Sequence, residues 1–159
     1  MRLYKDFREF SKGKSTIQKF STLICNPCFH SVCLYRLSNL LYRIKLSPLA
    51  KLVWYINRLV FNVDIDYRAD LAGGFFLVHG LGTVIGHNVI SKGRLTVYQG
   101  VTLGGGNGKP GRVDEDGKTR GMPLFEDNVI VYTGATVVGG ITISKDTIIK
   151  AGEIVCSDR

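Results

Sequence analysis

Apolar side chains recur at every sixth position over two long stretches of this chain. A six-residue period matches neither the 3.6-residue period of an α-helix nor the alternation of a simple strand. It is typical of a parallel β-helix, in which three hexapeptides complete one coil and the apolar column points into the core. The sequence therefore predicts a mainly β fold, a left-handed parallel β-helix. The columns are Ile65, Leu71, Leu77, Thr83, Val89, Leu95 and Val101, and then Val131, Val137, Ile143, Ile149 and Val155.

The chain before residue 61 has a different pattern. Leu, Ile, Val and aromatic residues lie three and four positions apart, which is typical of amphipathic helices. Pro27 and Pro48 stand where helices can begin. We expect a short helical N-terminal region over 1–60 and a β-helix domain over 61–159. Gly, Pro and charged residues dominate 106–122, between the two columns, so we expect a loop extruded from the coil there.

The positive charge of the chain lies in the helical region. Residues 1–60 contain eleven Lys or Arg and two acidic residues, whereas the remainder is nearly neutral. Such a region can contact an anionic membrane surface or an acidic substrate, or it can simply be a solvated helical face. No nucleic-acid-binding motif accompanies the charge, so we expect no nucleic acid partner.

Two further observations bear on location and on metal binding. No apolar run reaches the roughly 18 residues that span a bilayer, and the start lacks a secretory signal, so we expect a cytoplasmic protein, with peripheral contact at the inner membrane face left open. The cluster of Cys25, Cys28, His30 and Cys33 has zinc-like spacing, but its second pair follows at once within a predicted helix. We expect small core residues there and no metal.

Three short motifs in the β-helix region keep a fixed spacing. Asp64 lies in VDI, His79 lies in VHG fifteen residues later, and QGVTLGG begins twenty residues beyond His79. The stretch 63–105 resembles the serine acetyltransferases, which are hexapeptide-repeat acyltransferases. The resemblance continues more loosely through NVIVYTGATVVGGITI and IIKAGEIV, and weakly upstream at LYRLSNLLYR.

The resemblance implies a homotrimer of β-helices that binds acetyl-CoA between neighbouring subunits, without a metal. It assigns the catalytic base to His79 and the orienting carboxylate to Asp64. A neutral imidazole accepts a hydroxyl proton near neutral pH, and a carboxylate partner fixes its tautomer. Without the flanking match, a structural role would be favoured for a histidine at a coil corner. The cofactor contacts implied by the resemblance are Gly104, Gly105, Thr133, Gly134, Lys150 and Ala151.

The positions that resemble the acceptor site depart from the family pattern. The family has an Asp directly before the catalytic His, where this chain has Val78. It has Arg-His-Pro in the loop, where this chain has Arg120, Gly121, Met122 and Pro123. An apolar Val78 cannot pair with an ammonium group, whereas Arg120 can bind a carboxylate or phosphate.

We therefore expect acetyl transfer from acetyl-CoA to a hydroxyl-bearing small molecule or glycan, with contacts from Val78, Arg120 and Met122. The preferred acceptor is a sugar of a cell-surface polysaccharide. One alternative is a serine O-acetyltransferase of cysteine biosynthesis. An alternative of another class is a non-catalytic hexapeptide-repeat scaffold.

Overall fold

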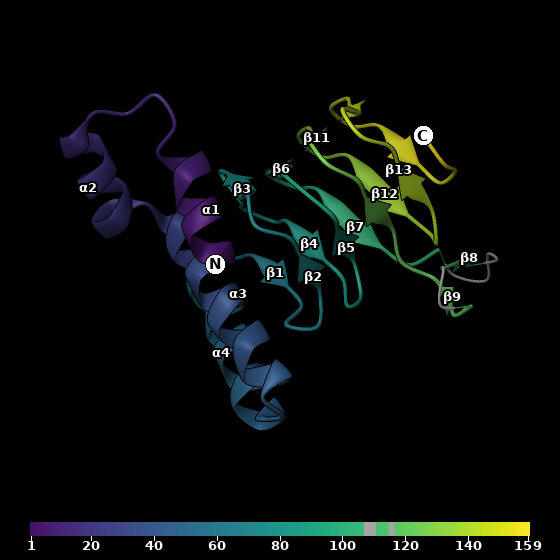
Figure 1. Cartoon of the computed structure of the whole chain (residues 1–159), viewed down its shortest axis with the longest axis horizontal. Helices are drawn as coiled ribbons and strands as arrows, with labels where there is room; N and C mark the ends of the chain where they lie inside the picture. Colours follow the sequence, from purple (N-terminus) through teal and green to yellow (C-terminus); the bar gives the residue numbers. More distant parts are fainter. Residues whose placement is uncertain (107–110, 115–116) are drawn as a thin grey trace.

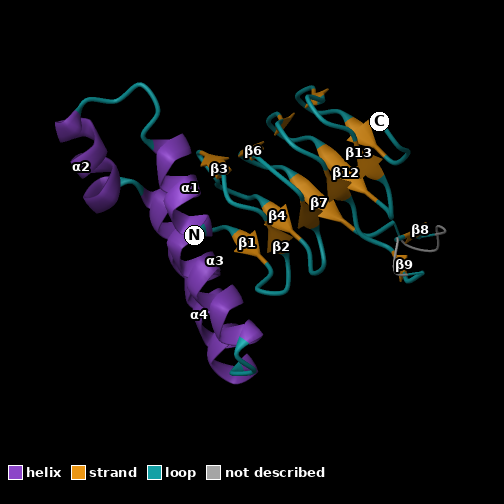
Figure 2. Cartoon of the chain, in the orientation of Figure 1, coloured by secondary structure: helices purple, strands orange, loops and turns teal. Residues whose placement is uncertain are grey.

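The computed structural model describes residues 1–106, 111–114 and 117–159. Residues 107–110 and 115–116 belong to the predicted loop 106–122 and lie outside the described residues. In the described chain, four helices precede the strands (Figures 1 and 2). They are α1 (Arg2–Phe10), α2 (Thr16–Cys25), α3 (Pro27–Arg43) and α4 (Ser47–Phe61).

The strands form a parallel β-helix whose coils stack in register (Figure 1). Each complete coil contributes one short strand to each of three sheets. The first sheet contains β1 (Asp64–Ile65), β4 (Val84–Ile85), β7 (Thr102–Gly104), β12 (Thr136–Val138) and β15 (Ile154–Val155). The second contains β2 (Asp70–Leu71), β5 (Ile90–Ser91), β10 (Leu124–Phe125) and β13 (Thr142–Ile143). The third contains β3 (Phe75–Val78), β6 (Leu95–Tyr98), β11 (Val129–Val131) and β14 (Ile148–Ile149).

The two six-residue columns form the core of this β-helix. Every member of both columns is at most 2% exposed. Thr83, the polar member, is buried with its hydroxyl donating to the backbone carbonyl of Tyr98 at 3.1 Å, so its burial leaves no unpaired hydroxyl. The predicted left-handed parallel β-helix with a short helical N-terminal region is confirmed.

Side chains of α3 hydrogen-bond to backbone carbonyls of the first coil. Within the stack, N–H groups of one coil donate to carbonyls of the next, as Asp64 does to Thr83. The carbonyls of the first coil have no coil beneath them, and α3 supplies donors in its place. The pairs are Tyr35 with Ala69, Arg36 with Leu71 and Ala72, and Asn39 with Tyr67 and Ala69.

A buried carboxylate on α1 completes this junction. Asp6 is fully buried and accepts hydrogen bonds from Arg36 at 2.8 and 3.0 Å. It also accepts the backbone N–H groups of Gly74 and Phe75 at 2.8 and 2.9 Å. Phe10 packs edge-on against Phe76, with ring centroids 4.7 Å apart. The Asp6 side chain therefore joins α1, α3 and the first coil.

Local sequence signals explain where the helices begin. Ser15 and Gln18 form a reciprocal capping box at the start of α2. Asn26 caps α3 and is followed by Pro27 at the first helical position. The helix α2 stands away from the β-helix, whereas α3 and α4 lie side by side (Figure 1). No described helix is long and apolar enough to cross a membrane.

The chain leaves the coil after β7 and returns to it at β10. Its described residues contain a short antiparallel pair, β8 (Arg112–Val113) and β9 (Thr119–Arg120). Arg112 and Arg120 both pair with Asp114, at 2.7 and 3.0 Å. The pair lies against the coil so closely at Gly140 that a β-carbon there would collide with the carbonyl of Arg120. The described part of 106–122 therefore packs against the coil, whereas we expected only a loop extruded from it.

Candidate active site

His79 occupies the corner between β3 and β4, at the boundary with the helices. It follows β3 directly and has a positive φ of 62°, which turns its exposed side chain outward from the coil. Non-glycine residues rarely adopt this conformation, and such outliers gather at functional sites. Two cavities meet at His79: one of about 630 Å³ on the outer face of β3, and one of about 200 Å³ beside the end of α4.

Cys28, on the first turn of α3, lines both cavities with His79. Burial raises the pKa of the Cys28 thiol and outweighs a backbone hydrogen bond from His79 that lowers it. The thiol is therefore held mainly neutral near pH 7. The thiol forms a compact, polarizable part of the pocket wall. Its rate of alkylation can report whether a ligand occupies the pocket next to the imidazole.

Asp64 begins β1, and its carboxylate has partners on α4. The neighbouring residues Val63 and Gly80 are in close contact, which places the two predicted catalytic residues on adjacent coils. The Asp64 carboxylate accepts the indole N–H of Trp54 at 2.8 Å and pairs with Arg58 at 3.3 Å. No hydrogen bond joins it to His79 among the described residues. The orienting role of Asp64 therefore stays a prediction.

Strand register places a column of corner residues on the edge that begins at His79. Leu77, Val97, Val131 and Ile149 are aligned by the strand pairing, and His79, Gln99, Thr133 and Ala151 each lie two positions after one of them. The predicted cofactor contacts Thr133, Gly134, Lys150 and Ala151 are exposed at corners of this edge. Gln99 Oε1 is buried without a hydrogen-bond partner among the described residues, so it can accept a donor from a ligand.

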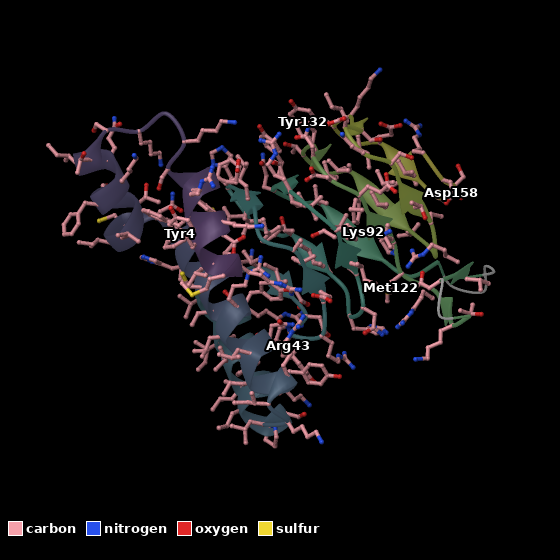
Figure 3. All side chains as sticks on the ribbon, viewed as in Figure 1. Tyr4, Arg43, Lys92, Met122, Tyr132 and Asp158 are labelled. Atoms are coloured by element: carbon pink, nitrogen blue, oxygen red, sulfur yellow. The ribbon has the colours of Figure 1, made fainter. Side chains whose placement is uncertain are left out.

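A second group of predicted residues lies on a different edge, where β7 leaves the coil. Gly105, Arg120 and Met122 line a cavity of about 490 Å³, together with His87. Gly104 is the last residue of β7 and directly precedes Gly105. Figure 3 shows Met122 on the side of the β-helix that faces away from the helices. Within one chain, the structure therefore separates these residues from His79, whereas Val78 lies beside it.

Two residues at these edges were not predicted as site residues from the sequence. Gln99 begins the motif QGVTLGG, and His87 belongs to none of the three motifs. His87 is indeed exposed, yet it lines the cavity with Arg120. The available signal was the coil length: three hexapeptides are eighteen residues, and Gly105 follows His87 by that interval, in agreement with the pairing of Ile85 and Leu103.

The cysteine cluster differs in part from the prediction. Cys28 and Cys33 are half-buried against the core, as expected, but Cys25 is exposed at the end of α2 and is not a core residue. The ring of His30 hydrogen-bonds to the carbonyl of Leu23 at 2.8 Å. Within the described ranges, no group of three or more His, Cys, Asp or Glu side chains is arranged to hold a metal ion.

Comparisons with known proteins agree on one family. No protein-family model matches the chain. It is 36% identical over 157 residues to a serine acetyltransferase of Synechococcus elongatus, which covers 98% of this chain and 61% of that protein. It is 32% identical over 153 residues to a serine acetyltransferase of Helicobacter pylori, which covers 95% of this chain and 84% of that protein.

The fold gives the same result. A solved serine acetyltransferase in complex with CoA superposes with a TM-score of 0.82, at 25% identity, over 98% of this chain and 61% of that one. The chain thus spans about three fifths of the length of some relatives and most of the length of others. The resemblance noted in the stretch 63–105 extends through the helices to nearly the whole sequence, and this chain belongs to the serine acetyltransferase family of hexapeptide-repeat acyltransferases.

Proposed function

We propose that this chain is an acetyl-CoA-dependent O-acetyltransferase in which His79 is the general base. The observation that carries the proposal is the exposed imidazole at a coil corner where two cavities meet, on an edge along which Gln99, Thr133 and Ala151 are aligned with His79. Family membership and the CoA complex of a solved relative support the same chemistry.

The reaction needs one proton acceptor and one site for the thioester. His79 takes the proton of the acceptor hydroxyl, and the hydroxyl oxygen attacks the thioester carbonyl carbon. The tetrahedral intermediate collapses with cleavage of the C–S bond, and the CoA thiolate receives the proton from the imidazolium. Asp64 would steady that imidazolium if its carboxylate turned toward the ring from its contact with Arg58 at 3.3 Å.

The polar corners above His79 suit an extended cofactor. Thr133 and Gly134 offer backbone groups that a ligand can approach closely, and Lys150 offers a cation for a phosphate. Gly104 and Gly105, on the other edge, would meet the same cofactor from a neighbouring subunit. This division of the site between two edges supports a homotrimer, in which each cleft is built from two chains.

The comparisons favour L-serine as the acceptor, since the matched relatives are named as serine acetyltransferases. They give no support to the sugar acceptor that we expected from Val78 and the altered loop, nor to membrane contact through the basic N-terminal region. Val78 is half-buried beside His79, so the structure offers no acidic residue at that position for the serine ammonium group. L-Serine is therefore the first acceptor to test.

The proposal is tested by measuring thiol release from acetyl-CoA in the presence of L-serine, with His79→Asn beside the parent. Asn tolerates the left-handed backbone conformation, so this variant should fold. Loss of the base should lower kcat by about 10²- to 10⁴-fold. Unfolding temperatures of the two proteins control for stability. Equal turnover by both would remove His79 from the mechanism, and no acetyl transfer from the parent to any hydroxyl compound would favour the non-catalytic scaffold.

A further inference from the structure

The larger cavity at His79 is a long pocket between the helices and the outer face of the β-helix. Its floor is formed by Phe76 and Val78 of β3 and by Thr96 of β6. Phe10 of α1 forms an apolar wall and is in edge contact with Phe76. The pocket thus combines an apolar surface from Phe10, Phe76 and Val78 with charged and polar side chains, as is usual in small-molecule sites.

The pocket extends well away from the imidazole. His79 follows the last residue of β3, whereas Arg94 precedes Leu95, which pairs with the first residue of that strand. A four-residue strand spans about 13 Å. The volume of about 630 Å³ therefore continues past the reacting position, and an acceptor with its hydroxyl at His79 has room for further groups.

The rim of this pocket is positively charged. Lys12 and Lys14 line it from the segment between α1 and α2, and Arg94 lines it from the far end. Lys14 is positioned by a hydrogen bond to Thr22 at 2.9 Å. The acidic residue of the lining is Glu9, and it pairs with Arg94 at 3.4 Å. Among the described residues, neither lysine has an acidic partner, so the two form a positive pair at the rim of the pocket.

We propose that this pocket binds the acceptor, and that the acceptor carries a carboxylate or phosphate group held by Lys12 and Lys14 while its hydroxyl lies at His79. The inference rests on the proposed acetyl transfer and names its substrate class: an anionic hydroxyl compound. Lysine ammonium groups bind such anions through charge-assisted hydrogen bonds. The basic rim adds anion-binding groups on the His79 side of the site to the guanidinium that the altered loop supplies at Arg120.

The test compares acceptor pairs that differ in one anionic group. Thiol release from acetyl-CoA is measured with L-serine against L-serinamide, and with glycerol 3-phosphate against glycerol. The charged member of at least one pair should have the higher kcat/KM by about tenfold or more. Preference in the first pair identifies a carboxylate as the bound anion, and preference in the second identifies a phosphate. Equal use of charged and uncharged members in both pairs would overturn the inference and leave acetyl transfer intact.

The double variant Lys12→Ala/Lys14→Ala assigns the effect to this rim. It should raise KM for the preferred charged acceptor by about tenfold and leave the uncharged partner unchanged. The matched control is Lys19→Ala/Lys51→Ala, which removes the same charge from exposed positions outside the pocket. An equal effect of both double variants would attribute the preference to overall charge and contradict the proposal.

Cys28 provides a readout that does not need turnover. It lies in the same pocket, so glycerol 3-phosphate or L-serine should slow its alkylation in the parent but not in Lys12→Ala/Lys14→Ala. Protection without any acetyl transfer would support the anion pocket and contradict the proposed function. Absence of protection by either anion, in a parent that shows no charge preference, would contradict the pocket.

Discussion

At the scale of single residues, the site depends on a backbone conformation as much as on an imidazole. His79 has a positive φ, and the corner after it continues through Gly80 and Gly82, both also at positive φ. This tight turn directs the ring out of the coil. An inward orientation would bury the imidazole in the core. A β-branched residue at position 79 would be strained there, and it would change the corner as well as the chemistry.

A first prediction separates two roles of Asp64. Asp64→Asn should lower kcat by about tenfold or more, because an amide cannot stabilise the imidazolium. Trp54→Phe removes the indole donor at 2.8 Å but keeps the carboxylate, and should leave kcat near that of the parent. Steady-state kinetics and thermal unfolding of both variants provide the measurement. If both variants lose stability alike and neither changes kcat, Asp64 only anchors α4 to the coil.

At the scale of elements, the helices and the β-helix are joined by buried polar contacts. Asp6, Arg36 and the first coil form a network in which the Arg36 side chain is only 9% exposed and Asp6 is fully buried. Removing one partner of such a pair leaves an uncompensated buried charge. The position of α1 also sets the wall of the proposed acceptor pocket at Phe10. The junction that stabilises the fold therefore also shapes this pocket.

The corresponding prediction concerns the free energy of unfolding. Asp6→Ala should lower it by about 3–5 kcal/mol, because Arg36 loses its carboxylate while buried. Arg43 lies on the same helix as Arg36 and forms an exposed pair with Asp70 of β2. Arg43→Ala breaks that pair and should lower the free energy of unfolding by less than about 1 kcal/mol. Denaturant unfolding of both variants measures the difference. Similar small losses would show that water reaches Arg36 and replaces the network.

The sequence predicted the β-helix well because its core is periodic. All twelve column residues are buried, and Val63 and Gly80, the neighbours of Asp64 and His79, lie close together. The contacts with the helices are not periodic, so the pairing of Asp64 with Trp54 had no sequence signal. The pocket beneath Lys12 and Lys14 likewise depends on how α1 docks. Such contacts between an amphipathic helix and a coil are set by tertiary packing, which local pattern does not encode.

At the scale of the whole molecule, the division of the site between two edges predicts complementation between subunits. His79→Asn and Arg120→Ala should each be poorly active as homotrimers. Unfolded and refolded together in equal amounts, they should regain activity, because roughly a quarter of the clefts combine an intact edge from each parent. Mixtures of His79→Asn with His79→Ala are the control and should stay inactive. Sedimentation velocity verifies the trimer, and a monomeric active parent would contradict the model of shared clefts.

The hydrogen bonds from α3 to the first coil also bear on how the protein avoids end-to-end association of its β-helix. A β-helix is a stack that any strand with free N–H groups could extend at an uncovered end. Tyr35, Arg36 and Asn39 occupy the carbonyls that such a strand would use. The helical region thus covers this end of the stack and prevents β-helices from joining end to end into fibres. This role is separate from catalysis at His79.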